Sequence, residues 1–225
     1  MSLRALSAEI TACRRCPRLV EYRERVAREK RRAYRDSNYW GRPLPGFGDG
    51  AARLMVIGLA PAAHGGNRTG RIFTGDRSGD WLYETLYRFG FTNQPASTHR
   101  GDGLRLNDAY VTAAARCAPP DNKPTTQERR NCQPYLEREM RLLRRIRVVV
   151  ALGRIAFDAY LSARHALTMP VPQLRLQFGH ATLHQLSDVF LIGSYHPSQR
   201  NTQTGMLTHA MFDRVFAMAR RLLEK

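Results

Sequence analysis

Four short, largely apolar runs constrain the fold of this chain more than any other feature. They cover residues 54–60, 108–114, 148–153 and 189–194, and segments with helical spacing lie between them. A strand that is apolar on both faces is typical of a parallel sheet that helices cover on both sides. The pattern therefore predicts an α/β fold, a three-layer α/β/α sandwich with a central four-stranded parallel sheet.

The segments between these runs complete the expected architecture. Apolar residues at helical spacing predict helices over residues 17–35, 80–89, 126–145, 155–161 and 206–223, and Gly- and Pro-rich stretches predict loops over 38–50, 62–79 and 118–125. Residues 165–187 have no dominant pattern and leave room for one minor strand. Because no repeat, low-complexity tract or linker interrupts the chain, we expect residues 1–225 to form a single domain, to which a shared cysteine site ties the N-terminal basic helix.

The chain is strongly basic. Lys and Arg number 36 and Asp and Glu number 19, so the balance is 36 − 19 = +17, and all but three of the basic residues are arginine. The planar guanidinium suits phosphate because it donates two hydrogen bonds at once. An arginine-rich genome would explain the preference for arginine over lysine, but not the shortage of acidic residues. The charge therefore favours nucleic acid as the partner.

The sequence contains no signal for a membrane or for secretion. No apolar run approaches the roughly 18 residues that span a bilayer. Charges and cysteines follow the first five residues, where a secretory signal would have an apolar stretch. We therefore expect a cytoplasmic protein without a membrane segment.

Four cysteines, Cys13, Cys16, Cys117 and Cys132, form one C-x2-C pair and one pair separated by 14 residues. Disulfides are rare in the cytosol, whereas four thiolates with one tight pair are typical of a zinc ion or an iron–sulfur cluster. Four-cysteine zinc sites usually show two tight pairs, so the wide second pair mildly favours a [4Fe–4S] cluster and leaves zinc open. Four unrelated thiols are the simpler alternative, which the C-x2-C pair makes less attractive.

Polar loops follow three of the four predicted strands, and the carboxyl ends of parallel strands meet at one edge of a sheet. These loops supply a carboxylate (Asp76), an amide (Asn122), an imidazole (His196) and an aromatic ring (Phe73). None of them has the glycine pattern of a nucleotide-binding loop, which argues against a nucleotide cofactor. A flipped base needs a stacking face and hydrogen-bond partners, and cleavage of its N-glycosidic bond needs groups that stabilise a cation-like sugar and the departing base.

Each of these four residues also has a purely structural explanation. Asp76 can cap a helix that begins near Ser78, Phe73 can be a core residue, and His196 and Asn122 can order turns. Four such residues at the mouth of one sheet, beside a basic surface, favour a site.

Three segments resemble the family 5 uracil-DNA glycosylases, an iron–sulfur-containing type. They are GLAPAAHGGNRTGRIFTGD at 58–76, YVTAAARCAPPDNKPT at 110–125 and HPSQRNTQTG at 196–205, and the resemblance extends over nearly the whole chain. The related family 4 enzymes carry an acidic residue soon after the G-x-x-P motif and an asparagine at the end of the second strand. This chain has AAH at 62–64 and VTAA at 111–114 instead, and both departures are typical of family 5.

The resemblance implies a DNA-repair enzyme that flips uracil out of DNA, hydrolyses its N-glycosidic bond and leaves an abasic site. It implies other deaminated bases, such as hypoxanthine, as further substrates, and a mainly structural [4Fe–4S] cluster. We expect a monofunctional enzyme without a lyase step, because Lys123 is the only lysine in the three loops, and we expect a monomer.

The resemblance also implies a role for each candidate residue. These are Asp76, His196 and Asn122 for catalysis; Phe73, Gly58, Ala60 and His64 for the substrate; Arg68, Gln199, Arg200 and Asn201 for DNA; and Cys13, Cys16, Cys117 and Cys132 for the cluster.

Two other classes of function compete with this interpretation. A non-enzymatic, metal-stapled nucleic-acid-binding protein would account for the charge and the cysteines, but not for the polar loops. An electron-transfer iron–sulfur protein would be expected to carry a flavin or nicotinamide motif, and the sequence has none.

Overall fold

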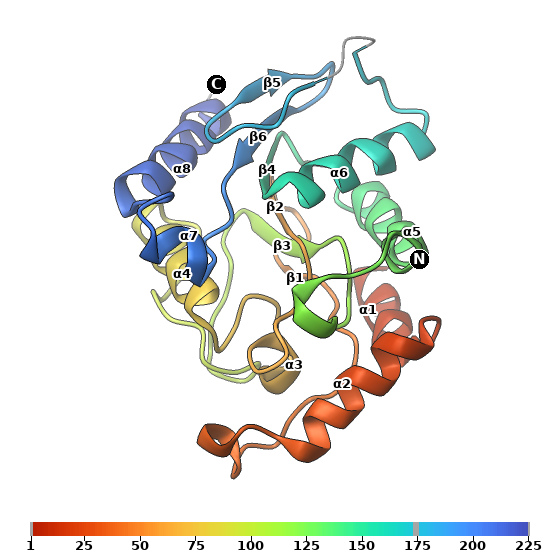
Figure 1. Ribbon diagram of the computed structural model, residues 1–225. Coiled ribbons are helices and arrows are strands. Elements are labelled where there is room, and N and C mark those ends of the chain that lie inside the picture. Colours follow the sequence, from red (N-terminus) through yellow and green to blue (C-terminus); the bar gives the residue numbers. More distant parts are fainter. Residues whose placement is uncertain (1, 173–175, 225) are drawn as a thin grey trace.

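The computed structural model describes residues 2–172 and 176–224. Its central sheet has six strands in the order β1-β3-β2-β4-β6-β5 (Figure 1). The strands are β1 (Phe47–Gly48), β2 (Leu54–Gly58), β3 (Ala109–Ala113), β4 (Val148–Leu152), β5 (Leu183–Gln185) and β6 (Phe190–Ser194). The inner four strands are parallel, while β1 and β5 are antiparallel edges. The α/β prediction is confirmed, but the expected sheet of four strands was too small.

Two short edge strands account for that difference. β1 has two residues and β5 has three, and neither is buried on both faces. The inner strands β2, β3 and β4 are buried at every position, so continuous apolar sequence marked them. β5 is the minor strand for which residues 165–187 left room; residues 173–175 of that range lie outside the described residues.

Helices cover both faces of the sheet. The long helices are α1 (Leu3–Ala12), α2 (Pro17–Glu29), α4 (Arg77–Arg88), α5 (Thr126–Leu142), α6 (Arg154–Ala166) and α8 (His209–Leu223). The shorter ones are α3 (Gly66–Thr69), α7 (Gln199–Gln203) and the 3-10 turns η1 (Arg32–Tyr34) and η2 (Pro120–Asn122). In Figure 1, α4 and α8 lie on one side of the sheet and α5 and α6 on the other.

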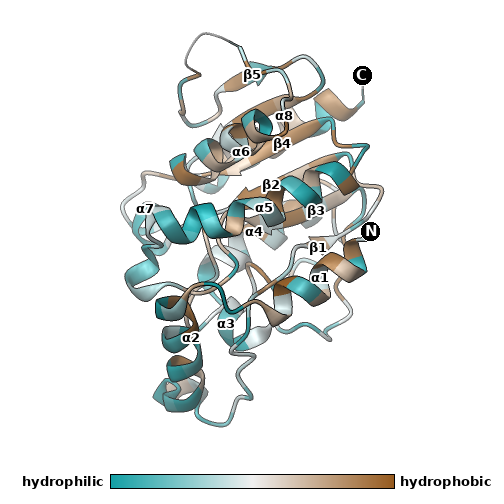
Figure 2. Ribbon diagram, turned by 90° about the vertical axis from the view of Figure 1, so that its right-hand side faces the viewer, coloured by the Kyte–Doolittle hydropathy of each residue, from teal (hydrophilic) through white to brown (hydrophobic). Residues whose placement is uncertain are grey.

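The two faces of the sheet form separate apolar cores. Val56 and Val111 belong to one core, together with Leu82 of α4 and Phe212 of α8. Alternate residues of the same strands pack with α5 and α6 in the other core. In Figure 2 the central strands are mostly hydrophobic, whereas outer helices such as α2 and α5 are largely hydrophilic. The three predicted layers are therefore present.

Several helix boundaries differ from the expected ones. The expected helix at 17–35 ends at Glu29 because Lys30 has a φ of +55°, and a 3-10 turn follows. The helix expected at 80–89 begins at Arg77, and the one expected at 206–223 begins at His209 after its cap Thr208. α1, α3 and α7 lie in segments for which no helix was expected. Within the described residues, no helix is long and apolar enough to cross a membrane.

Candidate active site

The ends of β2 and β6 bring two predicted site residues together. The Phe73 ring lies against Gly58, the last residue of β2: a Cβ on Gly58 would be 2.5 Å from Cζ of that ring. The same ring stacks on the imidazole of His196, which follows β6, with ring centroids 5.8 Å apart and planes inclined by 27°. Only glycine at position 58 leaves room for this arrangement.

The backbone of Phe73 has a conformation that is rare for a bulky residue. Its φ is +51°, in the left-handed region. Two contacts hold the turn: the Tyr83 hydroxyl donates to the carbonyl of Ile72 at 2.9 Å, and Gly79 approaches the Phe73 carbonyl so closely that a Cβ there would clash. The Phe73 side chain is 8% exposed and belongs to the core, so the core explanation is also correct.

Asp76 caps α4, as its structural explanation predicted. Its Oδ1 accepts hydrogen bonds from the backbone N–H groups of Ser78 at 2.9 Å and Gly79 at 3.1 Å. Its Oδ2 lies against Gly65 and has no hydrogen bond to any residue that the structure describes. Burial raises the pKa of the Asp76 carboxyl, against the opposing effect of the two N–H donors. One oxygen therefore caps the helix while the other remains available for chemistry.

The His196 imidazole is held in its neutral form. Burial lowers the pKa of His196 to about 4. The backbone of this residue is fixed, because the Asn201 amide donates to the His196 carbonyl at 2.9 Å. The ring itself has no hydrogen bond within the described part of the chain, so it can donate to a ligand as a neutral group.

We expect the His196 ring to titrate near pH 4 in an NMR titration, well below the ordinary value of about 6.5. Because the folded-state pKa is lowered, stability should decrease as the pH falls from about 6.5 toward 4, where the unfolded chain binds the proton first. His196→Gln assigns the signal and should remove this contribution. Titration of the ring between pH 6 and 7 would contradict a neutral His196.

His64 and Ala60 lie in the same loop after β2, and both are half-buried. Nδ1 of His64 is 2.9 Å from the hydroxyl of Tyr39, a residue that sequence reasoning missed. Burial lowers the pKa of His64, and Arg31 and Arg68 lower it further. In the sequence, Tyr39 is an aromatic residue in a Gly- and Pro-rich segment. That context does not indicate a contact with His64.

Arg68 holds the loop that carries Asp76. Its Nε donates to the carbonyl of His64 at 2.8 Å and its Nη2 to the carbonyl of Gly75 at 3.0 Å. The guanidinium also lies 4.0 Å from the centroid of the Tyr34 ring. The guanidinium of Arg68, a predicted DNA contact, therefore bonds to the protein's own backbone in the loop that leads to Asp76.

Arg68→Lys should lower the rate of the reaction at this site roughly tenfold or more, since hydrogen bonds to a charged group contribute about 1.5–3 kcal/mol each. Lysine keeps the charge but cannot span both carbonyls as a planar fork does. Single-turnover rates and DNA affinity should be measured side by side with Arg200→Ala, which removes an exposed arginine of α7. A loss of affinity alone in Arg68→Lys would mean that Arg68 contacts DNA directly.

The other predicted DNA contacts lie on α7, directly after His196. Gln199 and Arg200 are exposed, whereas Asn201 is half-buried and bonds to the His196 carbonyl. α7 begins with Ser198 as its cap. Gln199 and Arg200 are thus accessible to a ligand, and the side chain of Asn201 orders the loop.

Asn122 does not join the other three residues. It is exposed in η2 with a φ of +56°, and no contact with Phe73, Asp76 or His196 occurs among the described residues. The chain after β3 first follows the neighbouring loop, because the Ala114 N–H donates to the Gly58 carbonyl. It then turns toward α2, where Arg18 donates to the Lys123 carbonyl, and enters α5. The expected convergence of three loops is therefore observed for two of them.

Comparison with known proteins decides the family. The profile of the uracil DNA glycosylase superfamily matches residues 45–220. The chain belongs to the uracil DNA glycosylase superfamily. Type-5 uracil-DNA glycosylases from Mycobacterium bovis, Mycobacterium leprae and Thermus thermophilus are 52%, 51% and 48% identical to it. The alignments cover 98%, 98% and 99% of this chain and 82%, 96% and 99% of those proteins. The predicted family resemblance is confirmed.

In this superfamily member, the four cysteines line one small cavity between the N-terminal helices and the α/β body. Cys13 follows α1, Cys16 precedes α2, Cys117 follows β3 and Cys132 lies in α5. Among residues 2–172 and 176–224, no group of three or more His, Cys, Asp or Glu side chains is arranged to hold a metal ion. The tertiary fold nevertheless brings together two pairs that are about 100 residues apart in sequence.

Two of the four sulfur atoms accept hydrogen bonds from nitrogen donors. Arg23 is 2% exposed, and its Nη1 donates to Sγ of Cys117 at 2.9 Å. The Asn131 amide donates to Sγ of Cys16 at 3.3 Å. Burial raises the pKa of Cys117 to about 12. Four sulfur donors in one buried cavity, two of them with N–H donors, fit an iron–sulfur cluster, because a cationic metal centre deprotonates its thiol ligands and hydrogen bonds to sulfur tune it.

Proposed function

We propose that this chain is a monofunctional uracil-DNA glycosylase, which hydrolyses the N-glycosidic bond of uracil in DNA and leaves an abasic site. One observation carries the proposal: in a chain that is about half identical to type-5 uracil-DNA glycosylases over nearly its whole length, the Phe73 ring stacks on a neutral His196 at the carboxyl edge of the sheet. A parallel sheet of this kind binds its ligands at that edge. The non-enzymatic alternative does not account for this arrangement.

The reaction begins when the damaged nucleotide leaves the duplex, at a cost of a few kcal/mol that is lowest for a mispaired base. The Phe73 ring offers an apolar face, and the glycine-rich loop from Gly58 to Gly66 lets the backbone approach the base. Ala60 and the alanines at 62 and 63 leave room beside it. We propose that this room admits hypoxanthine as well as uracil.

Asp76 and His196 divide the chemistry of bond cleavage. The free Oδ2 of ionised Asp76 stabilises the cation-like sugar or positions the attacking water. The neutral imidazole of His196 donates a hydrogen bond to the base as negative charge develops on it. Asn122 is a further candidate for contact with the base, in a loop that would have to approach the substrate. Without a lysine at the site, water is the nucleophile and no lyase step follows.

We propose that Cys13, Cys16, Cys117 and Cys132 hold a [4Fe–4S] cluster. When bound, the cluster supplies a structural crosslink of four thiolates rather than a step of hydrolysis. The chain's own residues prepare the site: Arg23 and Asn131 donate to two of the sulfurs. The buried ion pair between Arg116 and Glu139, 2.7 Å apart, holds the segment before Cys117 against α5.

The test is excision from labelled duplexes that carry one uracil or one hypoxanthine. We expect strand cleavage only after alkali, because alkali breaks the strand at an abasic site that the enzyme leaves intact. An unmodified duplex of the same sequence is the control. Cleavage without alkali would indicate a lyase, and bound but unprocessed DNA would favour the non-enzymatic alternative. Gel filtration of the same protein tests the expected monomer.

A further inference from the structure

Trp40 is held rigidly beside the loop that carries the candidate active site. Its backbone N–H donates to the carbonyl of Arg68 at 3.0 Å, and the next N–H, of Gly41, donates to the carbonyl of Asn67 at 3.0 Å. The indole N–H donates to the carbonyl of Pro43 at 3.3 Å. The neighbouring Tyr39 bonds to His64. Backbone hydrogen bonds therefore attach the segment of Trp40 to the loop that leads to Asp76.

Two arginines lie over the Trp40 ring. The guanidinium carbons of Arg100 and Arg42 are 4.4 Å and 5.7 Å from the ring centroid. Both side chains are exposed, and neither has an ion pair or a side-chain hydrogen bond within the described residues. Other arginines of this chain, such as Arg53 and Arg71, are bound to the carboxylates of aspartates. A ring that orders a guanidinium leaves all of its N–H donors free for an anion.

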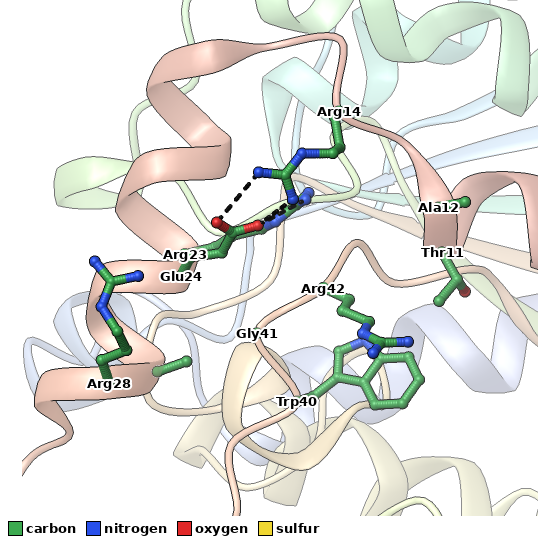
Figure 3. A pocket seen from close by; sticks show the side chains of 10 residues that line it. Thr11, Ala12, Arg14, Arg23, Glu24, Arg28, Trp40, Gly41 and Arg42 are labelled. Atoms are coloured by element: carbon green, nitrogen blue, oxygen red, sulfur yellow. Dashed lines mark hydrogen bonds and ion pairs between the residues drawn. The ribbon is translucent and has the colours of Figure 1, made fainter.

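Three hollows share Trp40 as a wall residue, and all but one of the charged residues in their walls are arginines. Figure 3 shows one of them, in which the Arg42 guanidinium lies beside the indole and Arg28 extends from α2. The single carboxylate in its wall, Glu24, is already bonded to Arg14. The other two hollows share Arg100 and have no acidic residue in their walls. The volumes of about 540, 590 and 600 Å³ are each ample for a phosphate group.

We propose that Arg42 and Arg100, ordered by Trp40, bind backbone phosphates of the DNA that flanks the flipped nucleotide. The proposal rests on the proposed function, because it takes DNA as the ligand. A DNA backbone carries a regular row of phosphates, and this unpaired arginine pair borders the catalytic loop in a chain of charge +17. Phosphate contacts of this kind position a duplex without reading its sequence.

The experiment measures the affinity for an undamaged duplex at a series of salt concentrations. Arg42→Ala/Arg100→Ala should weaken binding and reduce the slope of log affinity against log salt by about two, since each phosphate contact contributes roughly 0.9 to that slope. Arg144→Ala/Arg145→Ala is the matched control. Those two arginines are also exposed and have no ion pair within the described residues. They precede β4 at the amino ends of the parallel strands, whereas the candidate site lies at the carboxyl ends.

The control pair should leave the slope nearly unchanged, although it removes the same charge. Equal reductions in both double variants would overturn the proposal and indicate a diffuse effect of net charge, as would an unchanged slope in Arg42→Ala/Arg100→Ala. A temperature of thermal unfolding equal to that of the wild type verifies that both variants are folded. Because the duplex is undamaged, the result is independent of excision: a wild-type protein that binds with the expected slope but removes no uracil would refute the proposed function alone.

Discussion

Asp76→Asn should lower the rate of uracil excision by roughly 10²–10³-fold while leaving the fold intact. The substitution removes the negative charge that stabilises the sugar cation or orients water. Asparagine is as good an N-cap as aspartate, so its side-chain oxygen can still accept from the N–H groups of Ser78 and Gly79. Single-turnover excision and thermal unfolding, measured on the same protein, separate the two functions of this carboxylate.

Two further variants make the Asp76 result interpretable. Asp76→Ala should lose the activity and also about 1 kcal/mol of stability, because alanine cannot cap α4. Asp80→Asn removes an exposed carboxylate from the first turn of the same helix and should retain the activity. If Asp76→Asn turned over as fast as the wild type, Asp76 would be only a helix cap.

The wild-type rate should also depend on pH through Asp76. Burial raises the pKa of this carboxyl, so its ionised fraction decreases as the pH falls through the raised pKa. The excision rate should decrease with the ionised fraction of Asp76 and approach the rate of Asp76→Asn. The rate of Asp76→Asn itself should show no decrease of this kind as the pH falls.

Cys117→Ser should release the proposed [4Fe–4S] cluster and destabilise the protein by several kcal/mol, since structural metal sites contribute on the order of 10 kcal/mol. The four cysteines join α1, α2, the loop after β3 and α5, and α1 and α2 lie outside the sandwich of helices around the sheet. Four quantities should decrease together: iron per chain, acid-labile sulfide per chain, visible absorption and the temperature of thermal unfolding.

Asn131→Ala is the control for the cysteine variant. It removes the hydrogen bond to Sγ of Cys16 but no sulfur ligand, so it should keep its iron and most of its stability. Wild-type protein that contains zinc and no iron would refute the iron–sulfur proposal. A stable, metal-free wild type would indicate that the four thiols pack as ordinary small side chains.

The sequence predicted much of the fold because a continuous apolar run indicates a segment that is buried on all sides. Leu54–Gly58 and Val148–Leu152 are buried at every position, and no short apolar run of this kind fits a solvent-exposed element. β1 escaped prediction, and β5 could be expected only as one minor strand somewhere in residues 165–187, because edge strands bury only part of their residues and bond on one side. α7 escaped because its five residues carry no apolar periodicity.

The candidate site also has features that the sequence predicts and features that depend on tertiary packing. The α/β class, the basic charge, the cysteines and the presence of Phe73, Asp76 and His196 after strands could all be predicted from the amino-acid sequence, because burial, charge and residue type are local properties. Three other features depend on how the chain packs: Phe73 stacks on His196, Arg68 donates to the loop before Asp76, and Asn122 lies apart. Such pairings join residues up to about 120 positions apart, and their geometry depends on how the sheet and helices pack, which no local pattern encodes.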